Sequence, residues 1–191
     1  MKRLVMWMGL AALVAPLAMA QSSTWVSDPA HSEVDFSVRH MSVSNVHGRI
    51  GAVAATIVFD PVNVARSTVT ATIGVGTLDT GVTARDTHLK SPAFFDVARF
   101  PTATFTSTAV TRTATGMTVA GNLTLHGVTR PVVLQVEGPM GPAPGMDHKP
   151  HAGYSASTTI SRTAFGIGTA FPSAVVGDDI KLDIELEVVK Q

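Results

Sequence analysis

The chain has 191 residues, with 14 basic and 14 acidic side chains, no cysteine, and 45% hydrophobic against 15% charged residues. This charge balance excludes the strongly basic chain that an electrostatic nucleic-acid binder needs. The lack of cysteine excludes disulfide frameworks, thiolate metal sites and a cysteine nucleophile, and the hydrophobic content argues against disorder.

The first twenty residues have the form of an export signal. Lys2 and Arg3 supply a positive start, Leu4–Leu17 is an apolar run, and Ala18-Met19-Ala20 fits the small-x-small rule for cleavage. The run is short for a membrane span, although a retained anchor is the alternative. We therefore expect cleavage after Ala20, a periplasmic location and one mature domain over residues 21–191. Loss of the two basic residues would leave a net charge of −2.

Short segments with a hydrophobic residue at every second position predict strands throughout the mature chain. Gly, Pro, Asp or Asn bounds most of them. Eight strands are expected, over residues 34–38, 53–59, 68–75, 102–109, 117–125, 132–136, 154–160 and 180–188. Eight is near the number at which an antiparallel sheet closes into a barrel with room for a small ligand. Closure also removes exposed strand edges, so the fold class is all-β, an eight-stranded antiparallel barrel.

One segment predicts a short helix between strands. Thr83 and Asp86 have the spacing of a capping box, and residues 84–91 could form two helical turns before Pro92. The segment also carries Arg85 and His88. These polar groups have two interpretations: a solvated and capped helix face, or a network at the mouth of a cavity that binds the polar head of an apolar ligand.

Between the strands at 132–136 and 154–160, residues 138–145 are rich in Gly and Pro and predict a loop. His148 and His151 follow, three residues apart and beside Asp147. A metal site would need a further ligand that the sequence does not place, and such a pair in a polar loop is more often exposed to solvent. We therefore predict no metal site and no cofactor.

Nucleophilic catalysis finds little support. No GxSxG motif is present, and the nearby Asp28, His31 and Ser32 lack the strand-turn-helix setting that exposes an activated serine. We predict no catalytic residues and expect a binding protein rather than an enzyme.

Several blocks occur in the order and at the spacing of one known family. They are Trp25-Val-Ser-Asp28 with His31-Ser32, Phe36-Ser-Val-Arg-His40, Arg85-Asp86-x-His88-Leu89-Lys90-Ser91, Phe94-Phe95-Asp96, Gly121-Asn-Leu-Thr-Leu-His126-Gly127 and Ser161-Arg162-x-x-Phe165-Gly166. From Trp25 to Lys190 the chain resembles the YceI family of exported lipid-binding proteins. Ile50 and Leu78 depart from the family pattern by apolar exchanges that would reshape a cavity without removing it.

The resemblance implies an extended eight-stranded antiparallel barrel of lipocalin-like shape, with a helix between strands and an elongated apolar cavity. It also implies a polyisoprenoid such as a polyprenyl quinone, or another long-chain lipid, as the ligand. The apolar residues expected to line the cavity are Val34, Phe36, Val38, Val69, Ile73, Phe105, Val119, Leu123, Tyr154 and Ile160. Arg85, Asp86 and His88 are the candidates for contact with the head group, His31 also falls in a family block, and which of them meets the ligand stays open. The alternative is that the apolar side chains fill a dry core.

The expected function is therefore binding, transport or storage of such a lipid in the periplasm. An interaction module without lipid carriage and an enzyme acting on a lipid head group are the alternatives. The threonine-rich strand faces are compatible with a homodimer, nucleic acid is excluded as a partner by the charge, and the membrane donor or acceptor stays open.

Overall fold

The alternating segments form nine strands in the computed structural model, which describes residues 22–191. The predicted export signal, residues 1–20, lies outside the described residues. The strands are β1 (Ser23–His40), β2 (Ser44–Ile50), β3 (Val53–Phe59), β4 (Thr68–Gly74), β5 (Thr102–Arg112), β6 (Met117–Leu125), β7 (Val128–Pro144), β8 (Pro150–Ser161) and β9 (Val176–Lys190).

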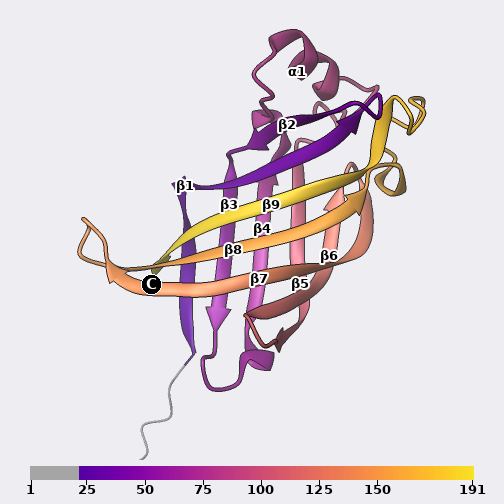
Figure 1. Cartoon of the computed structure of the whole chain (residues 1–191). Coiled ribbons are helices and arrows are strands. Elements are labelled where there is room, and N and C mark those ends of the chain that lie inside the picture. The colour runs from indigo at the N-terminus through magenta and orange to yellow at the C-terminus, as the bar shows by residue number, and fades with distance from the viewer. Residues whose placement is uncertain (1–21) are drawn as a thin grey trace, which may run out of the picture.

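Eight of these strands close a ring. They run in the antiparallel order β1-β3-β4-β5-β6-β7-β8-β9, and β9 pairs back with β1 (Figure 1). β2 stands outside the ring order because it pairs only with the second part of β1, from Val34 to His40. The predicted eight-stranded barrel is therefore confirmed. The additional strand β2 is not predicted, because Val46 and Ile50 are its only large apolar residues and Gly48 between them weakens the two-residue hydrophobic pattern.

The segment 138–145 is not the loop that its composition predicts. Its first seven residues continue β7, and Met140 and Ala143 pair with β8 across two shifts of register. Bulges of this kind let a strand tolerate the prolines and glycines that interrupt a regular ladder. The connection to β8 is consequently the short turn at residues 145–149.

The predicted helix is present as α1 (Thr83–Lys90), at the upper end of the barrel in Figure 1. Its predicted cap is wrong, because the N-cap position is Val82 and no side chain bonds there. The carboxylate of Asp86 instead accepts hydrogen bonds from Thr80, outside the helix. Three short 3₁₀ helices complete the chain: η1 (Val64–Arg66), η2 (Val75–Thr77) and η3 (Thr163–Phe165). Within residues 22–191, no helix is long and apolar enough to cross a bilayer.

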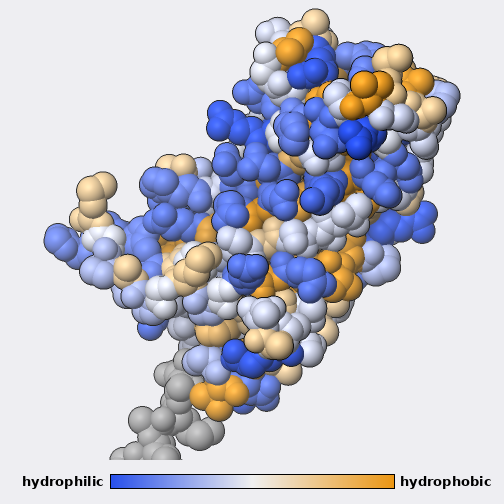
Figure 2. Space-filling view, viewed as in Figure 1, coloured by the Kyte–Doolittle hydropathy of each residue, from blue (hydrophilic) through white to orange (hydrophobic). Residues whose placement is uncertain are grey.

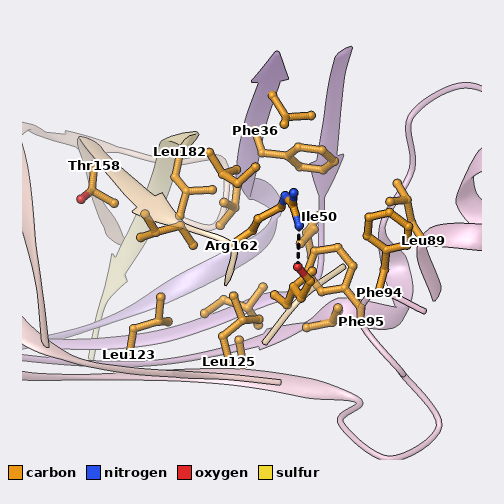
Figure 3. Close-up of a pocket in the computed structure, with 18 of the residues that line it drawn as sticks. Phe36, Ile50, Leu89, Phe94, Phe95, Leu123, Leu125, Thr158, Arg162 and Leu182 are labelled. Carbon is orange, nitrogen blue, oxygen red and sulfur yellow. Dashed lines mark hydrogen bonds between the residues drawn. The ribbon is translucent and has the colours of Figure 1, made fainter. Parts of the chain in front are cut away.

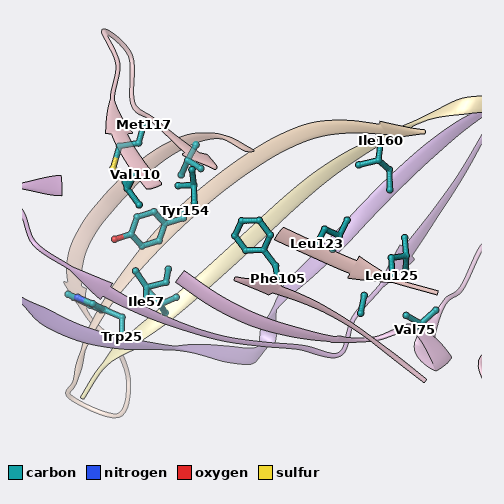
Figure 4. Close-up of a cluster of buried hydrophobic side chains, with 14 of the residues drawn as sticks. Trp25, Ile57, Val75, Phe105, Val110, Met117, Leu123, Leu125, Tyr154 and Ile160 are labelled. Carbon is teal, nitrogen blue, oxygen red and sulfur yellow. The ribbon is translucent and has the colours of Figure 1, made fainter. Parts of the chain in front are cut away.

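The barrel interior is filled at one end and hollow at the other. Trp25, Ile57 and Tyr154 are buried in the filled part. In Figure 4, Phe105 lies between this group and Leu123, Leu125 and Ile160, which line the cavity. The same division recurs along single strands: Met117 of β6 belongs to the filled part, whereas Leu123 lines the cavity. The sequence left open whether the inward side chains line a cavity or fill a dry core. They line a cavity in one half of the barrel and fill the other half.

Candidate functional site

The hollow part is an apolar cavity of about 420 Å³ near the α1 end. Strands from around the ring contribute aliphatic and aromatic side chains to its wall (Figure 3). Ala103 and Phe105 face inward from β5 because threonines occupy the alternate, outward positions. The cavity reaches the surface beside the exposed Arg39, His40 and Val175. A closed barrel with this lining can enclose an apolar chain and admit it from one end.

Most of the sequence-predicted site residues lie on the cavity wall. They are Val34, Phe36, Val38, Val69, Ile73, Arg85, His88, Phe105, Leu123 and Ile160. Val119, Tyr154 and Asp86 are not among the lining residues. Val119 and Tyr154 belong to the filled end, where burial raises the pKa of the Tyr154 phenol to about 12. Direct contact of any of these residues with a ligand stays a prediction.

The polar residues of α1 fasten the helix to the preceding segment. The Thr80 amide and hydroxyl both donate to Asp86 Oδ1, at 2.9 and 2.5 Å. Arg85 donates from Nε to Thr80 Oγ1 at 2.7 Å and from Nη2 to the Thr80 carbonyl at 2.9 Å. The hydroxyl bond from Thr80 lowers the pKa of Asp86 below its ordinary value. Asp86 is therefore a structural group, whereas Arg85 combines this role with a place on the cavity wall.

His88 belongs to an aromatic group at the same end. Its ring meets Phe94 edge-on at a centroid distance of 5.1 Å and Phe171 at 5.8 Å, and the two phenylalanine rings stack at 4.8 Å. All three residues line the cavity. An exposed imidazole beside aromatic rings can offer a hydrogen bond to a head group while the chain contacts the apolar wall.

Arg162 is a site residue that the sequence interpretation did not single out. It is 2% exposed and lines the cavity. Its guanidinium makes five hydrogen bonds to backbone carbonyls, namely those of Ile167, Gly168, Phe171, Val176 and Gly177. A guanidinium has five N–H donors, so these bonds occupy all of them. Arg162 therefore holds the loop between η3 and β9 rather than a ligand.

Asp178 braces the start of this loop from outside. Ser161 Oγ donates to Asp178 Oδ2 at 2.7 Å, and the Thr163 hydroxyl and amide donate to Oδ1 at 2.7 and 3.0 Å. The side-chain bonds from Ser161 and Thr163 hold the pKa of Asp178 below its ordinary value of 3.8. The stabilisation is therefore present above about pH 4 and is lost as the pH falls through the folded-state pKa.

We expect Asp178→Asn to lower the free energy of unfolding by about 1 kcal/mol at pH 7, because an amide accepts fewer hydrogen bonds and carries no charge. The difference from the parent protein should begin to shrink below about pH 4 and should vanish as the pH falls through the lowered pKa of folded Asp178, where its carboxylate becomes protonated. Urea unfolding at pH 7 and pH 3 measures both effects. Asp179→Asn is the control, since Asp179 is exposed; an equal loss in the two variants at pH 7 would contradict the assignment.

A second polar cluster lies on the outer side of the barrel, where β1, β8 and β9 meet. His31 Nδ1 lies 2.9 Å from Asp28 Oδ2. His151 contacts Glu187 Oε1 through Nδ1 at 2.6 Å and Asp147 Oδ1 through Nε2 at 2.9 Å. These bonds raise the pKa of both imidazoles, His31 through Asp28 and His151 through Glu187 and then Asp147. His151 is thus paired rather than solvated, while His148 is exposed as the sequence predicts.

The same cluster contains Asp28, His31 and Ser32, the three residues weighed in the sequence analysis as a catalytic triad. The hydroxyl of Ser32 donates to the Glu187 carbonyl at 3.2 Å and is buried. His31 bonds to Asp28 by way of Nδ1. Ser32 therefore ties β1 to β9.

Comparison with known proteins places the whole described domain in one family. A model of the YceI-like domain matches residues 25–188. A UPF0312 protein of Vibrio cholerae is 34% identical, over 98% of this chain and 97% of that protein. The protein YceI of Salmonella newport is 34% identical over the full length of both chains.

Solved structures show the same barrel. BcnA of Burkholderia cenocepacia matches with a TM-score of 0.72 at 24% identity, covering 84% of this chain and 98% of that one. The Campylobacter jejuni YCEI protein matches at 0.70 with 32% identity, covering 80% and 90%. A domain from Saccharophagus degradans, described as polyisoprenoid-binding, matches at 0.63 with 15% identity, covering 90% and 100%.

Proposed function

The chain belongs to the YceI-like domain family, and from that premise we propose that it binds a polyisoprenoid or related long-chain lipid in its barrel cavity and carries or stores it in the periplasm. The observation that carries this proposal is the apolar cavity of about 420 Å³ at the α1 end. Its volume lies within the range of small-ligand sites. The polyisoprenoid-binding description of the Saccharophagus domain supports the class of ligand.

The composition of the wall favours a chain over a compact polar ligand. Residues such as Ile73, Phe105 and Leu123 offer only apolar contacts, and the buried cation Arg162 is already bonded to five carbonyls. Burial of each CH₂ group contributes about 0.8 kcal/mol. Affinity therefore comes from the length of chain enclosed, and binding rather than catalysis is the function that we assign.

The polar end of the ligand belongs at the mouth, beside α1. Arg85 uses Nε and Nη2 to hold Thr80, which leaves its Nη1 group available, and His88 is exposed at the same end. Both side chains line the cavity. A hydroxyl, quinone carbonyl or phosphate at the end of the chain would accept hydrogen bonds from these groups.

Exchange with a membrane would use the same end of the barrel. Figure 2 shows a mostly hydrophilic surface with apolar patches, several of them toward the α1 end. Met41 and Val43, in the turn between β1 and β2, are 59% and 80% exposed, and Val82 before α1 is 47% exposed. Apolar side chains around an opening let a lipid pass from a bilayer without crossing water. An export signal would place the protein beside such a bilayer, in the aqueous space that an insoluble chain must cross.

A series of isoprenoid alcohols of increasing length tests this function. We expect the dissociation constant to fall with each added isoprene unit until the cavity is filled, and then to level off, because each buried CH₂ contributes about 0.8 kcal/mol. Competition against a fluorescent fatty probe measures the constants. Equal affinities for short and long alcohols would contradict binding through the enclosed chain.

A further inference from the structure

The polar cluster on the outer side of the barrel is separate from the lipid cavity, and none of its residues lines that cavity. It forms where β1 departs from regular pairing with β9. Ser27 pairs with Val188 and Ser32 pairs with Leu186, so four residues of β1 stand opposite Glu187 alone. The chain at this point is the corner at which β1 bends, on the side of the molecule from which the β7–β8 hairpin projects (Figure 1).

The bulge brings the side chains of Asp28 and His31 close to Glu187. Asp28 Oδ1 accepts the Ala30 amide at 2.9 Å, which fixes the turn, and Asp28 Oδ2 faces His31 Nδ1 at 2.9 Å. Ser32 accepts the Glu187 amide at 3.3 Å and so fixes the opposite strand. One ligand atom each from Asp28, His31 and Glu187 lies within 4.8 Å of the other two. Zinc bonds to nitrogen and oxygen are about 2.0 to 2.2 Å long, so two atoms bound to one ion lie at most about 4.4 Å apart. Small side-chain movements would therefore bring the three ligand atoms onto a single ion.

We propose that Asp28, His31 and Glu187 form a binding site for a divalent transition-metal cation such as Zn²⁺, with His151 positioning Glu187. This site goes beyond lipid binding and does not depend on it. One imidazole and two carboxylates are ligands that such ions accept, and a solvent molecule would complete four-coordination. The hard ions Mg²⁺ and Ca²⁺ prefer oxygen alone, so the imidazole selects against them.

His151 supplies the support that bound metals commonly have around their ligands. Its Nδ1 faces Glu187 Oε1 at 2.6 Å, and its Nε2 faces Asp147 Oδ1 at 2.9 Å. The Nδ1 contact leaves the second oxygen of Glu187 for the ion. Partners of this kind fix the orientation of the ligand, and their loss typically weakens metal binding by about ten- to a hundredfold. Because Asp147 lies in the turn of the β7–β8 hairpin, the site would join that hairpin to the corner of β1.

The cleft around the cluster is open to solvent and has a volume of about 1130 Å³. Asp28, Asp147, Glu185 and Glu187 give it four carboxylate side chains, while Lys149 is the one lysine or arginine among its lining residues in the described part of the chain. The excess of negative charge attracts a cation. If the cluster were only a set of internal ion pairs, it would bind no metal ion. Titration with metal distinguishes such a cluster from a metal site.

Isothermal titration of the purified, chelator-treated protein with Zn²⁺ tests the site. We expect saturation at one Zn²⁺ per chain and no comparable binding of Mg²⁺. Asp28→Asn is the sharpest variant, because asparagine retains the oxygen that accepts the Ala30 amide but removes the anionic ligand. Asp28→Asn and His31→Ala should each weaken binding by at least about tenfold, and His151→Ala by about ten- to a hundredfold.

The matched control is His47→Ala, which removes an exposed imidazole from β2 and should leave affinity unchanged. Circular dichroism of every variant confirms that the barrel is folded. Co²⁺ in place of Zn²⁺ adds a visible spectrum that reports ligand geometry, and the Asp28→Asn variant should lose it. Failure of the parent protein to saturate at one Zn²⁺, or equal affinities of Asp28→Asn, His31→Ala and His47→Ala, would overturn the proposal.

Discussion

Arg162→Ala is expected to lower the free energy of unfolding by about 4 kcal/mol. The guanidinium bonds five backbone carbonyls between Ile167 and Gly177. A buried acceptor left without a partner costs about 1 to 3 kcal/mol, and water entering the space would satisfy some of the five. The loop from η3 to β9 should also loosen, since Arg162 joins its two ends. Equilibrium unfolding in urea measures the loss, and hydrogen exchange of the loop amides locates it.

Two variants make this result specific. Arg162→Lys should recover part of the stability, because an ammonium has three donors for the five carbonyls. Arg130→Ala removes an exposed arginine with a single 3.3 Å bond to the Ala164 carbonyl and should change stability little. If Arg162→Ala unfolds at the same urea concentration as Arg130→Ala, the structural role given to Arg162 is wrong.

Ala103→Phe is expected to weaken lipid binding by more than about a hundredfold. Ala103 is 5% exposed and its methyl group lines the cavity beside Ile73, its partner on β4. A phenyl group there would occupy the space of several chain carbons. At about 0.8 kcal/mol per CH₂, exclusion of four carbons costs about 3 kcal/mol, which corresponds to more than about a hundredfold in the dissociation constant. Competition with the fatty probe measures the change.

Ala54→Phe is the matched control for this variant. Ala54 is an exposed residue of β3 that points away from the interior, one residue before the buried Ala55. The same side chain is therefore added to the outside of the same barrel. The control should bind lipid as the parent does, and both variants should retain a cooperative thermal transition. Equal lipid affinity in Ala103→Phe and the parent would show that the ligand does not enter this cavity.

The two-residue period predicts the barrel well because each strand is apolar on one face. It identifies Phe36, Ile73, Phe105 and Leu123 as inward residues, and the structure places them on the cavity wall. The same period cannot distinguish a lining residue from a filling one. Val119 and Tyr154 are therefore predicted to line the cavity, although both lie in the filled end. That distinction depends on where along the barrel the side chains from opposite strands pack together and where they leave a space. A local sequence pattern does not contain this information.

Other features depend on partners that are distant in the chain or chemically unexpected. β2 forms against the edge that β1 offers, although its own sequence has only two large apolar residues, Val46 and Ile50. Asp86 bonds to Thr80 rather than to the start of α1, so the capping-box spacing of Thr83 and Asp86 predicts a cap that does not form. Arg162 is hidden from composition because its partners are carbonyls, which every residue has. The cluster of Asp28, His31 and Glu187 joins the two ends of the domain and follows from the closure of the barrel.

The central claim, that the cavity holds a lipid chain, is tested most directly by the cargo of the native protein. The measurement is isolation of the protein from its own cell envelope without detergent, organic extraction, and mass spectrometry of the apolar molecules released. We predict about one isoprenoid or similar long-chain lipid per chain, and its loss in Ala103→Phe but not in Ala54→Phe. An extract without such a lipid, repeated after incubation with polyprenyl lipids and equally empty, would contradict the claim.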